Sequence, residues 1–245
     1  MGPASFPGME KPGYLTALRR DGGRLAEAVR DLRAAVPACP GWDVAELVWH
    51  TGEVHWFWRQ IASGAVPGPD DYREPPRPAD DELVTWFAEG VDALAGALAA
   101  LDPAEPRWTW AERKDAGFIQ RRIAQETAVH CWDALSAAGR DEPVERELAV
   151  DGIDEFLRFF LPDAPPAGFR ADVHLHATDG PGEWLVRPSG ANWSVTGEHR
   201  KATAAVRGTA SDLLLLLWRR KGPEEVEVLG DAGPLEEFVD VSQLN

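Results

Sequence analysis

The stretch "RRIAQETAVHCWDALSAAG", residues 121–139, carries a glutamate and a histidine four residues apart within a predicted helix. Four residues is just over one helical turn, so Glu126 and His130 lie one above the other on the same face. At about 100° per residue, this face is the one that should turn toward a core. It comprises Ile119, Ile123, Glu126, Thr127, His130, Ala134 and Ala137. A carboxylate in a core must be paired, hydrogen-bonded or bound to a metal ion.

A third inward-facing group would favour metal binding over a simple Glu–His hydrogen bond, or over a helix turned so that both residues face water. A catalytic zinc usually takes three protein ligands and keeps one position open. In the predicted helix "PGWDVAELVWHTGEVHWFWRQIASG", His50 shares its face with the apolar residues at 47, 54, 57 and 61. His55 lies roughly 140° away, at the edge of that face, which predicts a pocket or supporting residue and not a ligand. The sequence therefore predicts a site formed by His50, Glu126 and His130 in the core of a helical bundle.

The other three histidines give weaker signals. His174 and His176 alternate on a predicted strand and point to one side of it, which is a weak metal pattern and more typical of packing or sheet-surface residues. His199 lies in a predicted turn, "TGEHRK", where we expect it to be solvated.

Composition excludes several classes of protein. The 245 residues are 44% hydrophobic and 27% charged, as is typical of a globular protein, and the net charge is −16. No basic stripe offsets that charge, so we expect no nucleic-acid partner. The start lacks a secretory signal, the longest apolar run, "LLLLLW", is too short to cross a bilayer, and the two cysteines fit a reducing compartment. These features predict a soluble cytoplasmic protein with no membrane association.

The hydrophobic period changes part-way along the chain. Up to about residue 160 it is helical, and from 171 onward it gives short strands separated by Gly, Pro, Asp or Asn. We therefore predict an α+β protein with a helical bundle at 10–162 and a smaller α+β domain at 163–245. Helices are expected at 14–35, from Asp43, from Asp80 or Asp81 to about 100, over the opening stretch as far as Gly139, and at 145–162. The "DGG" sequence is a candidate interruption of the first helix. Strands are expected at 171–178, 182–188, 192–197, 202–208 and 225–230, with further helices at 209–221 and 233–241.

Two long motifs, "CPGWDVAELVWHTGEVHW" and "RRIAQETAVHCWDA", resemble the mycothiol-dependent maleylpyruvate isomerase family. That family belongs to the DinB-like helical-bundle superfamily and is typical of actinobacteria. The resemblance extends over nearly the whole chain and implies an up-and-down four-helix bundle followed by a domain resembling sterol-carrier folds. It also implies a metal triad of two histidines and a glutamate, which fall on His50, Glu126 and His130. One difference is Gln125, where family members often have histidine; on the helical wheel Gln125 points away from the triad.

The resemblance implies a Zn²⁺ ion whose open position accepts the thiol of mycothiol. A coordinated thiol is deprotonated, so it becomes a nucleophile at neutral pH. Its addition to a conjugated cis double bond, followed by rotation and elimination, would give the trans isomer; related S-transferases keep the adduct. The partners implied are mycothiol and a small electrophile whose identity the sequence does not give.

A dicarboxylate substrate would need a cationic partner, and arginine provides the best geometry. The candidates are Arg207, Arg219 and Arg220. Arg220 falls where the family's C-terminal W-x-R segment has an arginine. We predict Arg220 and His55 as the catalytic residues, with His55 in the pocket. The alternative is that basic residues at this helix end only complement the helix dipole. Cys131 lies about 100° from the triad, where packing is the expected role.

Two other functions remain open from the sequence. The chain could be a non-catalytic carrier with a structural metal site, in which case a fourth protein ligand such as His55 would complete the coordination. Alternatively, it could be a metal enzyme that uses another thiol, or water in a hydrolysis.

Overall fold

The computed structural model describes residues 8–242, which form two compact units. The first is Met9–Glu142 and the second begins at Pro143, so the division lies earlier than the predicted boundary at 162. The reason is the helix α5 (Arg146–Phe159), which packs on α6 (Ala210–Leu217) of the second unit. Their contact includes the rings of Phe156 and Trp218, whose centroids are 5.2 Å apart.

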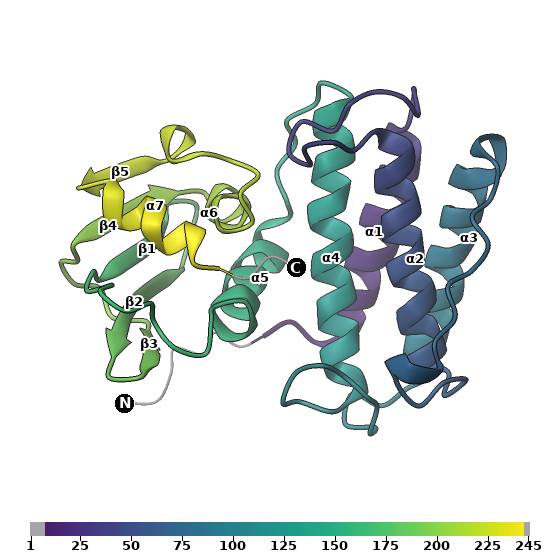
Figure 1. Cartoon of the computed structure of the whole chain (residues 1–245), viewed down its shortest axis with the longest axis horizontal. Helices are drawn as coiled ribbons and strands as arrows, with labels where there is room; N and C mark the ends of the chain where they lie inside the picture. Colours follow the sequence, from purple (N-terminus) through teal and green to yellow (C-terminus); the bar gives the residue numbers. More distant parts are fainter. Residues whose placement is uncertain (1–7, 243–245) are drawn as a thin grey trace. The chain divides into compact units, whose positions relative to one another are not determined.

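Four long helices form the first unit and stand side by side in Figure 1. They are α1 (Lys11–Ala28), α2 (Val44–Ala62), α3 (Asp80–Ala99) and α4 (Ala116–Ala137), with a short 3-10 helix, η1 (Pro69–Asp71), between α2 and α3. Helix α1 packs mainly on α4 and α3, while α2 packs on α3 and α4. The four-helix bundle is therefore confirmed, but its consecutive helices α1 and α2 are not close neighbours as in a simple up-and-down order. The connection 29–43 is long enough to cross the end of the bundle.

Local signals explain most of the helix boundaries. Asp43 caps α2 by accepting a hydrogen bond from the Glu46 backbone, as predicted. Gly139 adopts a φ of +73° just after α4, the left-handed conformation expected at a helix end. The predicted cap of α3 was wrong: Asp80 lies inside the first turn of the helix, where its carboxylate pairs with Arg33.

Helix α1 continues through the "DGG" sequence instead of breaking there. A Cβ atom at Gly22 would lie 2.8 Å from the side chain of Val91 on α3, so only glycine permits this approach of the two helices. The helix ends at Ala28, earlier than the predicted residue 35.

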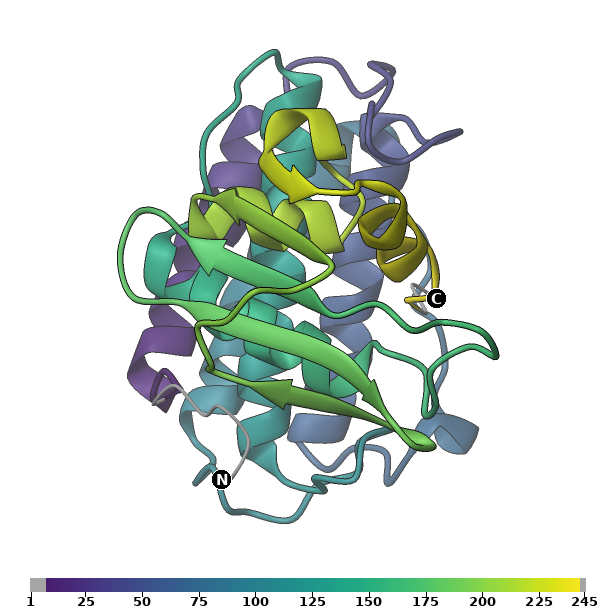
Figure 2. The same cartoon turned by 90° about the vertical axis from the view of Figure 1, so that its left-hand side faces the viewer.

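The second unit is built around a five-stranded sheet with the order β3-β2-β1-β4-β5 (Figure 2). The strands are β1 (Val173–Ala177), β2 (Glu183–Ser189), β3 (Asn192–Thr196), β4 (Ala204–Gly208) and β5 (Glu227–Gly230). Only β1 and β4 pair in parallel; the other pairs are antiparallel. A short 3-10 helix, η2 (Pro223–Glu225), and α7 (Gly233–Asp240) complete the unit, so every predicted strand and helix of this half is present.

One face of this sheet packs against α5 and α6. A Cβ atom at Gly208 would meet Leu213 of α6, and the indole of Trp184 donates a hydrogen bond to Asp154 of α5 at 2.7 Å. This face carries the fully buried residues Val173, Leu175, Trp184, Val186, Ala204 and Val206. The alternate residues of the same strands therefore point to the other face. Within residues 8–242 no helix is both long and apolar enough to cross a membrane.

Candidate metal centre

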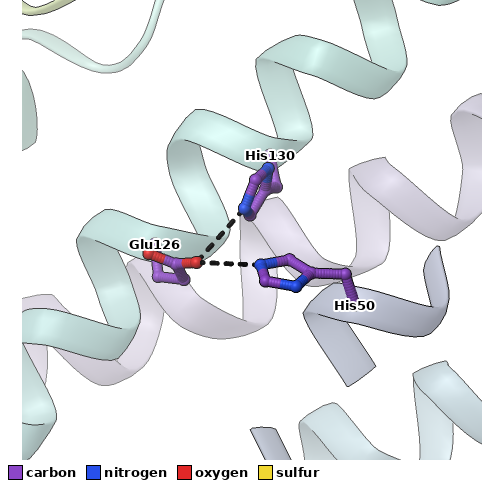
Figure 3. Close-up of side chains that lie close together, drawn as sticks. All are labelled: His50, Glu126 and His130. Atoms are coloured by element: carbon purple, nitrogen blue, oxygen red, sulfur yellow. Dashed lines mark hydrogen bonds and ion pairs between the residues drawn. The ribbon is translucent and has the colours of Figure 1, made fainter. Parts of the chain in front are cut away.

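His50, Glu126 and His130 lie together where α2 packs against α4 (Figure 3). The Oε1 atom of Glu126 is 3.1 Å from Nε2 of His130 and 3.6 Å from Nε2 of His50. The two imidazole rings meet edge to face with centroids 5.2 Å apart. The side chains of His50, Glu126 and His130, which the helical spacing predicted to face inward, thus point to one position.

The "CPGW" segment forms a turn that covers these histidines. Gly41 has a φ of +89°, and the Trp42 backbone donates a hydrogen bond to the carbonyl of Cys39 across the turn. The Trp42 ring then lies 4.9 Å from the ring of His50 and 6.4 Å from that of His130, centroid to centroid. The turn therefore gives the site an aromatic wall.

Asp133 and Arg122 fix the orientation of the α4 ligands. The Nδ1 atom of His130 is 2.9 Å from Oδ2 of Asp133, which is fully buried. Arg122 donates to the second oxygen of Glu126, Oε2, at 3.1 Å. If Nδ1 carries the proton shared with Asp133, the Nε2 lone pair of His130 is directed toward the site, as in many metal-binding histidines. Neither residue was predicted to have a role, although Asp133 stands three residues after His130 and Arg122 four residues before Glu126, both helical spacings.

These contacts shift the pKa values of both groups. Burial alone would raise the pKa of Glu126, but His130, His50 and Arg122 outweigh it and hold the pKa well below its usual range. Burial alone would lower the pKa of His130, but Asp133 and Glu126 raise it to about 9. The carboxylate is therefore ionised at neutral pH, and a metal ion would have to displace a proton from His130.

The site is accessible from one side. The side chain of His50 is 38% exposed, that of Glu126 20% and that of His130 8%. The apolar neighbours of His50 in the sequence suggested a position inside the bundle. Its side chain lies instead at the edge of the bundle interior. Solvent therefore reaches the three groups mainly at His50.

The donor set fits a divalent transition metal ion. The ligand atoms of the three residues lie within 4.8 Å of one another. Tetrahedral ligands about 2.1 Å from one ion are roughly 3.4 Å apart, between the two distances measured here from Glu126. Two imidazoles and one carboxylate form the ligand set of many catalytic zinc sites, which keep a further position for water or substrate.

Two family descriptions match the sequence. The mycothiol maleylpyruvate isomerase N-terminal domain matches residues 15–135, and the C-terminal domain of the same family matches residues 147–237. The chain belongs to this family. Each matched range falls within one of the two compact units.

Solved structures share the fold. A crystal structure of the mycothiol-dependent maleylpyruvate isomerase aligns with a TM-score of 0.65 and 13% identity, covering 90% of this chain and 93% of the other. A crystal structure of a histidine-to-alanine mutant of the isomerase gives a TM-score of 0.63 with the same identity and coverage. No curated protein sequence matches the chain.

In this member of the isomerase family, His55 is not one of the three residues whose ligand atoms converge in the bundle. Its side chain is almost fully buried, and its Nε2 is 2.8 Å from the hydroxyl oxygen of Thr127. The Thr127 hydroxyl donates to the Ile123 carbonyl, so Nε2 of His55 carries the proton that this bond needs. Burial lowers the pKa of His55 to about 3, so the ring is neutral. His55 thus packs on Thr127 inside the bundle, and the catalytic role predicted for it remains a prediction.

The three arginine candidates all lie in the second unit. The Arg207 guanidinium is 2.9 Å from Glu227, and Arg219 donates to the backbone carbonyls of Val239 and Asp240. Arg220 follows α6 and donates through Nη1 to the Trp218 carbonyl at 2.9 Å. Arg207 and Arg219 therefore have structural partners, and the catalytic role of Arg220 remains a prediction.

Cys131 should be inert in the folded protein. It is 2% exposed, and burial together with nearby Asp21 raises the pKa of its thiol to about 12. Because the thiolate is the reactive form, iodoacetamide at about pH 7.5 should leave Cys131 unmodified until the chain is unfolded. Peptide mass spectrometry checks this, with half-buried Cys39 as the internal comparison. Rapid labelling of Cys131 in the native chain would contradict the packing described here.

Proposed function

We propose that this chain is a zinc-dependent enzyme that uses mycothiol as cosubstrate to isomerise a small cis-unsaturated electrophile. The observation that carries the proposal is the convergence of His50, Glu126 and His130 on one solvent-accessible point. Membership of the mycothiol maleylpyruvate isomerase family supports the thiol and the reaction class. The two cysteines are free, which suits a protein working in a reducing compartment such as the cytoplasm.

In this proposal, each residue of the site has a defined task. His50, Glu126 and His130 would hold the ion, which when bound would keep a thiol ionised at neutral pH. Asp133 accepts a hydrogen bond from Nδ1 of His130, so that Nε2 is the nitrogen that would bind the ion once its proton is displaced. Arg122 holds Oε2 of Glu126, leaving Oε1 toward the two histidines. Trp42 covers one side and limits the approach of water.

The reaction balances without any redox partner. The thiolate sulfur forms a bond to one carbon of the conjugated double bond, whose π electrons move to the conjugated carbonyl. Rotation about the resulting single bond follows, and elimination then breaks the carbon–sulfur bond and returns the thiolate. If a proton traps the adduct instead, the outcome is thiol S-transfer, which is our second candidate within the same chemistry.

The structure favours an enzyme over a carrier with a structural metal. Structural zinc sites usually have four protein ligands. His55, the histidine that could have been a fourth ligand, is hydrogen-bonded to Thr127 instead. Among residues 8–242, the group of potential metal ligands in the bundle contains only His50, Glu126 and His130. An open position therefore remains for a thiol.

Metal analysis and a panel of thiols test this function. Protein purified without chelator should contain about one zinc per chain at this site and should isomerise maleylpyruvate only when mycothiol is present. Glutathione, cysteine and no thiol serve as comparisons, and zinc with mycothiol but no protein gives the background. Isomerisation that needs no thiol would contradict the proposed mechanism. The absence of any stoichiometric transition metal would contradict the metal site, whereas nickel or iron would change only the ion.

A further inference from the structure

A second group of metal-binding side chains lies in the second unit of the chain. It is a cluster of His174 and His176 on β1, Glu183 on β2, and His199 in the loop after β3. Glu183 lies at its centre: Oε2 is 2.5 Å from Nε2 of His174, and Oε1 is 2.5 Å from Nδ1 of His176 and 3.0 Å from Nδ1 of His199. Three imidazole rings therefore present a nitrogen to one carboxylate.

The strand register explains how the cluster forms. His176 of β1 pairs directly with Glu183 of β2, and His174 lies two residues earlier on the same side of β1. Because side chains alternate along a strand, these three lie on the face opposite Leu175 and Trp184, which belong to the buried face. Helices α5 and α6 lie behind the sheet in Figure 2, where this opposite face turns toward the viewer. Three of the four cluster residues are thus held by two paired strands, on the face opposite the buried residues Leu175 and Trp184.

His199 completes the cluster from the loop at 197–203. The sequence predicts that this residue is solvated, and its side chain is indeed 76% exposed. Its ring nevertheless lies 5.4 Å from the ring of His174 and 5.8 Å from that of His176, centroid to centroid. His199 is therefore solvated as predicted, but it also contacts the histidines of β1, because the fold brings the loop next to this strand.

The nearby arginines Arg207 and Arg200 pair with other carboxylates, so Glu183 supplies the negative charge of the cluster. Arg207 of β4 stands in register with His176 on the same face, but its guanidinium pairs with Glu227 of β5 at 2.9 Å. In the loop, Arg200 lies 3.9 Å from Glu198. Two imidazoles and one carboxylate then offer a donor set that suits zinc and similar borderline ions.

We propose that His174, Glu183 and His199 form a second site for one divalent transition metal ion of the zinc class. Their ligand atoms lie within 4.8 Å of one another. His176 acts as a positioning residue, since its hydrogen bond to Oε1 orients the carboxylate, much as partners behind metal ligands do elsewhere. This inference does not depend on the site in the bundle or on the proposed reaction.

Only small movements are needed to admit the ion. The direct contacts from Glu183 to His174 and His199, 2.5 and 3.0 Å, would open by less than about 1 Å, since ligands of one zinc ion are roughly 3.4 Å apart. Each imidazole already turns a ring nitrogen toward the carboxylate, so it can become a ligand by changing tautomer without turning over. His174, whose side chain is 5% exposed, provides the fixed end, and the exposed His199 closes the site.

Binding of the ion would tie the loop at 197–203 to the sheet. This loop contains Arg200 and Lys201, two trypsin cleavage positions that follow His199 directly. An ion held between His174 and His199 should therefore slow cleavage there.

Zinc titration of matched variants tests the proposal. All chains carry His130→Ala to weaken the bundle site, are stripped with chelator, and are titrated calorimetrically with ZnCl₂. Adding His199→Ala, an exposed change, should weaken zinc binding at the second site at least ~10-fold, as should Glu183→Gln. Adding Arg200→Ala, the neighbouring loop residue, should leave the affinity unchanged. Only the difference between matched chains is used, so any zinc that remains in the bundle does not affect the result.

Limited proteolysis gives a second readout on the same chains. Zinc should slow tryptic cleavage after Lys201 in the chain with His199 and should have no such effect with His199→Ala. The proposal is overturned if His199→Ala and Glu183→Gln bind zinc as tightly as the Arg200→Ala control. It is equally overturned if zinc binding at this cluster leaves cleavage of the loop unchanged.

Discussion

Turnover should fall at least ~10³-fold, with loss of most of the bundle-bound metal, when His130 or His50 is replaced with Ala or Glu126 with Gln. The three residues share one proposed ion, so removing any one of them opens the coordination sphere. Effects within such a unit are not additive, and the double change of His130 and Glu126 should be scarcely worse than either single change. Metal analysis and a mycothiol-dependent assay measure both losses.

The His50→Ala variant separates metal binding from a simple buried pair. His50 is on α2, whereas Glu126 and His130 hydrogen-bond each other on α4 at 3.1 Å. If that pair were only structural, His50→Ala would leave activity and metal near normal and cost about 1–3 kcal/mol of unfolding free energy at most. A His50→Ala chain with full metal and parental turnover would end the triad hypothesis.

His55→Ala is the matched control for the loss of a histidine from the same helix. His55 is buried against Phe87, with ring centroids 5.5 Å apart, and bonds to Thr127. Its removal should lower stability and weaken activity at most, while the metal is retained. A loss of metal equal to that of His50→Ala would mean that His55 acts as a ligand.

The helices and the triad could be predicted because their signals are local. Glu126 and His130 are one helical turn apart, so any helix over this stretch places them together. The position of His50 required only a second amphipathic helix, and Asp43 marks its start with a cap visible in the sequence. The strands were equally clear, because turn residues separate short β-branched runs.

Features that depend on packing or side-chain rotamers could not be read in this way. Arg122 stands four residues before Glu126, so helical spacing allows the two side chains to meet. That Arg122 holds Oε2 and leaves Oε1 to the histidines depends on side-chain rotamers, which the spacing does not show. The domain boundary was misplaced because α5 has the same period as the bundle helices, and only its packing on α6 shows where it belongs. The approach of His199 to β1 likewise depends on the path of a loop, which periodicity does not describe.

The contact between Asp133 and His130 leads to the last prediction. Asp133 is fully buried and accepts the Nδ1 proton of His130 at 2.9 Å, so it determines which nitrogen faces the metal. Asp133→Asn keeps the size of the side chain and an acceptor oxygen but removes the charge that makes His130 a better ligand. Loss of such a partner typically weakens metal affinity about 10–100-fold, and we expect turnover at limiting zinc to fall in proportion.

A second buried carboxylate in the bundle provides the control for this variant. Asp21 of α1 is 3% exposed and pairs with Arg20 at 2.7 Å, so Asp21→Asn also removes a buried charge but leaves the His130 contact intact. Chelator competition should show weaker zinc binding for Asp133→Asn alone, and saturating zinc should restore much of its activity. If instead both variants lose metal affinity equally, the effect belongs to bundle stability. If Asp133→Asn binds zinc like the parent, the carboxylate does not orient the ligand. Only a selective loss of affinity that excess zinc reverses identifies Asp133 as the residue that prepares His130 to bind the metal.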